Sequence, residues 1–199
     1  GADQLAVVSQ GDPFAADPVA ALQLLARIPV GDAAWDGPRD TALTSDHSRA
    51  YVTLSNSGKV ALVDMVAMRQ GDADPTVAGM NQIALPAGAR PYWIEIDPQD
   101  HYAYVSDELQ PAIYVIDINP KSVEFNKVTR TISLPGSETP HGLRQIAISE
   151  DGHKLYVAAP NRSFYGTRTI SNSYIHVVNI DPKDKPKTVA NPMKYWEVI

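Results

Sequence analysis

Five side chains in this sequence are of types that could hold an anionic or sugar-like ligand. They fall in three stretches whose spacings are 53 and 52 residues, and they are Arg39, Tyr92, Trp93, His141 and Arg144. Guanidinium groups bind carboxylates and phosphates through paired hydrogen bonds, and aromatic rings stack on cations and line small-molecule sites. If the fold brings the three stretches together, these side chains would converge on one funnel.

A structural role is the alternative for the same residues. In that case the arginines pair with carboxylates of a neighbouring unit, such as Asp40 or Glu95, and Trp93 is a packing residue. A second candidate surface is the segment 161–173, an insertion that we expect to form a long loop. Long loops on a rigid scaffold often carry binding residues, here Arg162, Phe164, Tyr165 and Arg168.

Several kinds of chemistry lack their motifs in this sequence. The histidines recur in turns of different units, at positions 47, 101 and 153, and their spacing does not match the close ligand pairs of zinc sites. There is no calcium loop with a central Gly and final Glu, no Gly-x-Ser-x-Gly and no phosphate-binding glycine loop. The chain has no cysteine, which excludes a CxxCH haem motif. We therefore predict no metal and no bound cofactor.

An internal repeat must position the candidate residues. Tyr51, Tyr104 and Tyr156 lie 53 and 52 residues apart, and each ends a pair of short apolar runs joined by a polar turn. This pattern predicts a β-hairpin. A third apolar run follows each hairpin, and a fourth closes the first two units before a proline. Four short strands repeated about every 50 residues predict an all-β fold, a β-propeller of four-stranded blades.

The repeat divides the single domain, 1–199, into about three and a half blades. We expect a half blade at 5–31 and full blades at 38–88, 90–136 and 143–199, the last with the insertion 161–173. The half blade lacks its first two strands and the last blade ends at its fourth strand, so we expect this chain to be part of a larger propeller. Two chains completing one ring, or a compact four-bladed ring, are the alternatives. Open blade edges could also lead to self-association.

The residues of the first unit resemble a known family. Ala50-Tyr51-Val52-Thr53, with Val63-Asp64 behind it and Ile28-Pro29-Val30-Gly31 ahead, is similar to the Tyr-Val-Thr-Asn repeat of bacterial β-propellers, which are related to lactonase-type seven-bladed propellers. The chain departs from that motif at Leu54, Ser106-Asp107 and Ala158-Ala159, where the motif would end in Asn. The resemblance implies the fold, but the motif residues build blades and imply no particular ligand.

Composition limits the possible partners. The chain carries 23 acidic and 17 basic residues, a net charge of −6, which argues against nucleic acid. Its longest charge-free apolar run, 18–26, is too short to span a bilayer. It lacks cysteine and begins Gly-Ala-Asp, which is compatible with a removed leader, so we expect a periplasmic or extracellular protein.

Three functions remain open from the sequence. The first is a non-catalytic module that binds a protein or a small anionic or sugar-like ligand on a propeller rim. The second is a lactonase-like hydrolase of a sugar-acid lactone, with Glu95 or His141 as general base beside Arg39 and Arg144. The third is a propeller subunit of a periplasmic redox complex. Because no catalytic motif is present, we expect the first.

Overall fold

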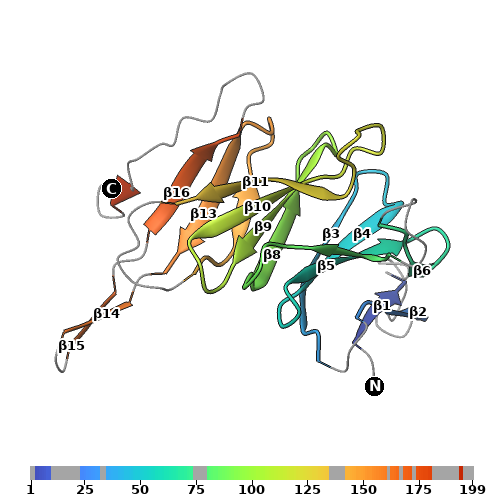
Figure 1. Ribbon diagram of the computed structural model, residues 1–199, viewed down its shortest axis with the longest axis horizontal. Helices are drawn as coiled ribbons and strands as arrows, with labels where there is room; N and C mark the ends of the chain where they lie inside the picture. The colour runs from blue at the N-terminus through green and yellow to red at the C-terminus, as the bar shows by residue number, and fades with distance from the viewer. Residues whose placement is uncertain are drawn as a thin grey trace, which may run out of the picture.

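The structure is a computed structural model that describes residues 3–9, 23–31, 35–73, 80–134, 142–160, 162–165, 168–171, 174–180 and 193–194; for 162–165, 168–171, 174 and 193–194 it describes the backbone alone. Every element in these ranges is a β-strand, and the strands form antiparallel sheets that lie beside one another like blades (Figure 1). The predicted all-β propeller architecture is therefore confirmed.

The half blade and blade 1 come first along the chain. The half blade pairs β1 (Gln4–Val8) with β2 (Leu24–Pro29). Blade 1 has the order β3-β4-β5, and its outermost position is divided between two short strands that both pair with β5. Its strands are β3 (Pro38–Leu43), β4 (Arg49–Leu54), β5 (Lys59–Asp64), β6 (Arg69–Gln70) and β7 (Gln82–Ala84).

Blades 2 and 3 follow the same order from the innermost strand outward. Blade 2 consists of β8 (Pro91–Ile96), β9 (Tyr102–Asp107), β10 (Ala112–Asp117) and β11 (Lys127–Ser133). Blade 3 consists of β12 (Ile146–Ile148), β13 (Lys154–Ala159), β16 (Tyr174–Asn179) and β17 (Met193–Lys194). The insertion that we expected to be a loop instead forms a hairpin, β14 (Arg162–Tyr165) and β15 (Arg168–Ser171), which projects away from blade 3 (Figure 1).

Apolar side chains fill the space between each pair of neighbouring sheets. Alternate residues of β4 face opposite ways, as the two-residue period of a strand requires. Val52 and Leu54 pack toward the half blade with Ile28, whereas Tyr51 packs toward blade 2 with Ile94. Blade 2 in turn packs against blade 3 through a third cluster. This face-to-face packing holds the innermost strands β3, β8 and β12 next to one another.

The three repeat tyrosines occupy equivalent strand positions but differ in exposure. Tyr51 is 0% exposed and Tyr104 is 4% exposed, because the next blade covers each ring. Tyr156, at the same place in blade 3, is 40% exposed, since no described residue forms a blade beyond it. The difference therefore reflects the neighbour that covers each ring rather than the blade that carries it.

Candidate functional site

One end of the blades carries the predicted arginines and aromatic residues. The start of each inner strand pairs with the end of the second strand, as Pro38 does with Leu54 and Pro91 with Asp107. The segments 35–37, 55–58, 88–90, 108–111 and 142–145 therefore lie at the same end, which we call the rim. The turns that join the first and second strands of each blade lie at the opposite end.

Tyr92 lies at the centre of the rim cluster. The guanidinium carbon of Arg39 is 5.9 Å from the centre of the Tyr92 ring, and that of Arg144 is 5.4 Å from it. These residues come from the start of β3, the start of β8 and the segment just before β12. The predicted convergence of Arg39, Tyr92 and Arg144 is thus present in the structure, as two cation–π contacts to one ring.

Glu108 connects the arginines of blades 1 and 2. Its carboxylate lies 2.7 Å from Nε of Arg90, in an ion pair without the alignment of a hydrogen bond, and 4.0 Å from Nη2 of Arg39. Ser55 Oγ is 3.5 Å from the same carboxylate. The side chains of Arg39 and Arg90 remain 46% and 40% exposed. These two arginines can therefore reach a ligand from solvent while the carboxylate holds them in place.

Arg144 is fixed by the backbone of blade 2. Its Nη1 donates to the carbonyl of Glu108 at 3.1 Å and to that of Leu143 at 2.9 Å. The close approach depends on Gly142, because a Cβ at this position would collide with the backbone of Glu108 and Leu109. Arg144 thus contacts the backbone of Glu108, whereas Arg39 and Arg90 lie beside its carboxylate, so three guanidinium groups gather at one part of the rim.

Sequence reasoning missed Arg90 and Glu108. Glu108 follows the repeat tyrosine of its blade by four residues, at the place that Ser55 occupies in blade 1. Comparing the ends of the second strands across the repeat would have shown a carboxylate next to the predicted arginines. Arg90 lies directly before the inner strand β8, and Arg144 lies close to the start of the inner strand β12. The same comparison of blades would therefore have identified Arg90.

Trp93 and Asp40 do not join this cluster. Trp93 packs against the core between blades 2 and 3, as in the structural alternative. The carboxylate of Asp40 accepts a hydrogen bond from the backbone N–H of Ile94 at 2.9 Å. Among the described residues Arg39 forms its ion pair with Glu108, so the expected pairing with Asp40 or Glu95 is not the one observed.

Glu95 lies on the inner strand β8, three residues beyond Tyr92. Its Oε1 accepts a hydrogen bond from Nε1 of Trp93 at 3.2 Å. Burial raises the pKa of the Glu95 carboxyl above its ordinary value, the Trp93 hydrogen bond opposes this rise, and the charge of Asp40 adds to it. A carboxyl with a raised pKa can accept a proton more readily near neutral pH, which suits a general base.

The remaining predicted residues have no described side chains. His141 lies outside the described residues. Arg162, Phe164, Tyr165 and Arg168 belong to the β14–β15 hairpin, of which the structure describes only the backbone. This hairpin follows the end of β13, whose Ala158 bonds with Gln145, so it departs from the rim end of blade 3.

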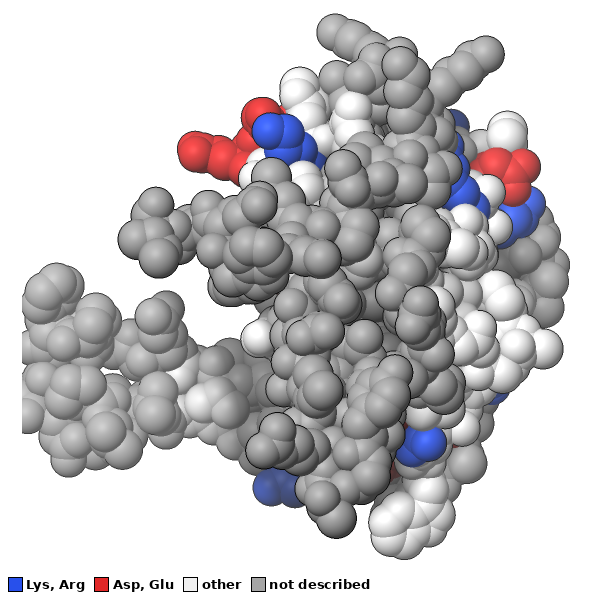
Figure 2. All heavy atoms as spheres, turned by 90° about the vertical axis from the view of Figure 1, so that its left-hand side faces the viewer, with Lys and Arg blue, Asp and Glu red and all other residues white. Residues whose placement is uncertain are grey.

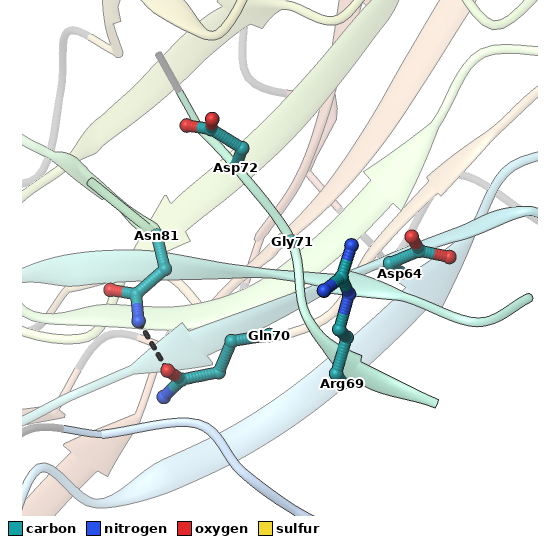
Figure 3. A pocket seen from close by; sticks show the side chains of 6 residues that line it. All are labelled: Asp64, Arg69, Gln70, Gly71, Asp72 and Asn81. Atoms are coloured by element: carbon teal, nitrogen blue, oxygen red, sulfur yellow. Dashed lines mark hydrogen bonds between the residues drawn. The ribbon is translucent and has the colours of Figure 1, made fainter. Parts of the chain in front are cut away.

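A shallow cavity of about 370 Å³ lies at the opposite end of blade 1, where the outermost strand is divided. Figure 3 shows its lining of Asp64, Arg69, Gln70, Gly71, Asp72 and Asn81, with Asn81 donating to Gln70. Two carboxylates, one guanidinium and two amides give it mixed polarity and no clear charge preference. It contains none of the residues predicted from the repeat. A neighbouring cavity of about 440 Å³ shares Asp64, Gly71 and Asp72 with this one.

Within the described ranges, His, Asp and Glu side chains do not gather in groups of three that could hold a metal ion. On the face in Figure 2, the described basic and acidic atoms lie near one another or singly, without a continuous area of one sign. The described part of the chain also contains no helix that is long and apolar enough to cross a membrane.

Comparisons with known proteins give a consistent family. A family model described as "Lactonase, 7-bladed beta-propeller" matches residues 64–192, well over half of the chain. The 6-phosphogluconolactonase of Bacillus subtilis is 32% identical over 72 residues, which cover 36% of this chain and 21% of that protein.

Solved structures show the same fold. The periplasmic gluconolactonase PpgL of Pseudomonas aeruginosa matches with a TM-score of 0.61 and 15% identity, over 92% of this chain and 48% of that one. A protein from Lactobacillus plantarum matches with a TM-score of 0.63 and 19% identity, over 92% of this chain and 49% of that one. The chain thus spans about half the length of these two propellers.

Proposed function

This chain belongs to the family of seven-bladed β-propeller lactonases, and on that premise we propose that its protein hydrolyses the lactone of a sugar acid. The observation that carries the proposal is the rim cluster, in which Arg39 and Arg144 contact the Tyr92 ring and Arg39 and Arg90 lie beside the carboxylate of Glu108. The resemblance to lactonase-type propellers is confirmed at the level of the family, whereas the Tyr-Val-Thr-Asn repeat itself stays a prediction.

The prediction of a non-catalytic binding module is wrong. It depended on the lack of a catalytic motif, but residues 64–192 match the lactonase family, and the Bacillus and Pseudomonas proteins named above bear lactonase names. A propeller site is assembled from single residues of several blades, each about 50 positions from the next. A local motif is therefore not expected even where the site is catalytic, and its absence was weak evidence.

Lactone hydrolysis makes two demands on the protein. A water molecule attacks the carbonyl carbon while a general base takes up one of its protons, and the ring C–O bond then breaks as that proton passes to the leaving ring oxygen, which becomes a hydroxyl group. The carboxylic acid formed at the same time loses its proton to solvent. Negative charge develops on the carbonyl oxygen and remains on the carboxylate of the product, so nearby cations stabilise the transition state. The exposed guanidinium groups of Arg39 and Arg90 could meet the second demand, and Glu95 is our candidate for the base.

The charge of the rim cluster favours an anionic substrate. The side chains of Arg39 and Arg90 are 46% and 40% exposed, whereas that of Glu108 is 14% exposed, so the groups that face solvent here carry a surplus of positive charge. Arginine binds phosphate and carboxylate oxygens in paired hydrogen bonds. A lactone that carries a phosphate fits this surplus, and the Bacillus relative bears the name 6-phosphogluconolactonase.

The experiment compares enzymatic with spontaneous ring opening. The protein is incubated with glucono-δ-lactone and with its 6-phosphate, and acid release is followed in a pH-stat against a protein-free blank. We expect faster release with protein, and a higher kcat/KM for the phosphorylated lactone. Replacing Arg90→Gln should lower kcat/KM by about tenfold, as expected for losing one charge-assisted contact.

A matched variant controls for the loss of charge. Arg130 lies exposed on the outermost strand β11, far along the blade from the rim, so Arg130→Gln should leave kcat/KM unchanged. Release no faster than the blank for either lactone would overturn the proposed activity. Equal effects of Arg90→Gln and Arg130→Gln on kcat/KM would show that the rim cluster does not contribute to the activity.

A further inference from the structure

Trp35 is the most exposed aromatic residue in the described part of the chain. It is 83% exposed and lies in the segment 35–37, which leads from the half blade into β3 at the rim. Leaving so large an apolar ring in water sacrifices the stabilisation that its burial would give. Such rings are enriched where one protein surface meets a ligand or partner.

The backbone that carries this ring is firmly held. The N–H of Asn56 donates to the carbonyl of Asp36 at 2.9 Å, and the N–H of Ser55 donates to that of Gly37 at 2.9 Å. The side-chain amide of Asn56 donates to the carbonyl of Trp35 at 3.0 Å. Gly37 has a φ of 68°, and a Cβ there would lie 2.7 Å from the Asn56 amide nitrogen. The loop is thus fixed while its ring remains in solvent.

The same amide joins Trp35 to the arginine cluster. Asn56 Oδ1 accepts a hydrogen bond from Nη2 of Arg90 at 3.3 Å. Arg90 in turn pairs with Glu108, which also lies near Arg39. A single side-chain amide therefore separates the Trp35 backbone from the nearest guanidinium of the site. A ligand bound to Arg90 would therefore lie beside the loop that carries the indole.

We propose that Trp35 is a specificity-determining residue that stacks on the closed ring of the lactone bound at the rim, an inference that rests on the proposed function. The closed ring of a sugar lactone presents a flat face of C–H groups, which suits an indole surface. The open-chain acid has no such face. Stacking therefore favours the substrate over its own product, while the arginines bind the anionic groups that both molecules share.

The test separates ring stacking from general binding. The protein and its Trp35→Ala and Trp35→Phe variants are assayed for KM and kcat with 6-phosphoglucono-δ-lactone, and for inhibition by open-chain 6-phosphogluconate. Trp35→Ala should raise the lactone KM about three- to tenfold, the range expected for one aromatic contact, with kcat and the product inhibition constant unchanged. Trp35→Phe keeps a ring and should stay within about twofold of the parent protein.

The controls make each outcome decisive. Val123 is 87% exposed on the far side of blade 2, and Val123→Ala should change neither constant. A lactone KM for Trp35→Ala within twofold of the parent overturns the proposal. An equal rise in the lactone KM and the product inhibition constant also overturns it, because the ring would then not distinguish the two molecules.

A protein that opens no lactone would remove the proposed activity but would still allow Trp35 to be judged. In that case the intrinsic tryptophan fluorescence of the parent and of Trp35→Phe is titrated with the same lactone. Quenching in the parent that disappears in Trp35→Phe supports the stacking contact. No quenching in the parent, or equal quenching in both proteins, overturns it.

Discussion

The guanidinium carbon of Arg144 lies 5.4 Å from the centre of the Tyr92 ring, across the boundary between blades 3 and 2. Arg39 approaches the same ring from blade 1, at 5.9 Å. Two like charges would otherwise repel each other, and a ring whose faces are electron-rich offsets part of that repulsion. Tyr92 therefore acts as the spacer that lets two cations share one site.

Replacing Tyr92 tests this spacer role. Tyr92→Leu removes both cation–π contacts, each worth about 0.5–1 kcal/mol at an exposed site, so we expect kcat/KM for the lactone to fall roughly five- to thirtyfold. Tyr92→Phe keeps the ring and should lose less than about twofold. Steady-state kinetics of the two variants check this. If Tyr92→Phe were as impaired as Tyr92→Leu, the hydroxyl rather than the ring would matter.

The pKa of Glu95 makes a prediction about pH. Burial raises the pKa of this carboxyl above its ordinary value of 4.5, so the folded protein holds the proton more tightly than the unfolded chain does. The contribution of Glu95 to stability is thus full below pH 4.5 and is lost as pH rises through the raised pKa. Glu95→Gln keeps the acceptor for Trp93 without the charge. Relative to the parent, its melting temperature should therefore increase as pH rises through this window.

Activity should respond in the opposite direction. A general base must be ionised, so lactone hydrolysis by the parent should rise with pH through the raised pKa of Glu95. Glu95→Gln should lose most of kcat, on the order of 100-fold, while remaining at least as stable at neutral pH. The exposed Glu124→Gln serves as control for both measurements. Retention of full kcat in Glu95→Gln would assign the base to another residue.

The repeat predicted where the backbone of the site lies better than how its side chains pair. Equal spacing placed Arg39, Tyr92 and Arg144 at equivalent points of three inner strands, and the structure brings them together. Which side chains pair with one another depends on local irregularities of the strands, and the spacing of the repeat does not show these irregularities. The register of β8 against β9 shifts between Pro91 and Ile94. The N–H of Ile94 donates a hydrogen bond to the carboxylate of Asp40.

The insertion and the outermost strand of blade 1 show a second limit. The segment 161–173 lacks a clear alternation of apolar and polar residues, yet it contains a hairpin whose two strands pair with each other. The repeat predicts one apolar run before a proline as the outermost strand of blade 1, and β7 lies there, but β6 occupies part of the same edge of β5. Both features depend on which backbone N–H and C=O groups pair with each other in the folded chain. The pattern of apolar and polar residues alone does not specify this pairing.

Asp107 offers a test of the turn that carries the rim carboxylate Glu108. This fully buried carboxylate accepts hydrogen bonds from the backbone N–H groups of Arg90, Leu109 and Gln110 and from the hydroxyl of Tyr114, all at 2.8–2.9 Å. Asp107→Ala leaves these donors without an acceptor, so we expect a loss of about 3–5 kcal/mol in the free energy of unfolding. Urea denaturation measures the loss.

An aspartate at the opposite end of blade 1 supplies the comparison. Asp64 also accepts two backbone hydrogen bonds in a turn, from Val66 and Ala67, but in an exposed setting where water can replace it. Asp64→Ala should therefore cost only about 1 kcal/mol. Similar losses for the two variants would show that the buried donors at Asp107 find other partners.

The contact between blades 1 and 2 can be tested at the repeat tyrosine. Burial raises the pKa of the Tyr51 hydroxyl, which stays protonated and donates to Asn126 Oδ1 of blade 2 at 3.0 Å, while accepting from Arg49 Nη1 at 3.1 Å. Tyr51→Phe removes one hydrogen bond from each of these two partners, away from solvent. We therefore expect the free energy of unfolding to fall by about 1–3 kcal/mol. At the equivalent position of blade 3, the exposed Tyr156 should tolerate Tyr156→Phe within about 0.5 kcal/mol.

A double-mutant cycle assigns that cost to the bond between the blades. Asn126 has a φ of 58°, so Asn126→Gly removes the side chain without straining the backbone. If the Tyr51–Asn126 bond carries the effect, Tyr51→Phe should cost about 1 kcal/mol less in the Asn126→Gly background than in the parent. Urea denaturation of the four proteins measures the difference. Strict additivity would place the loss in the contact with Arg49 and leave the coupling between the two blades to their apolar core.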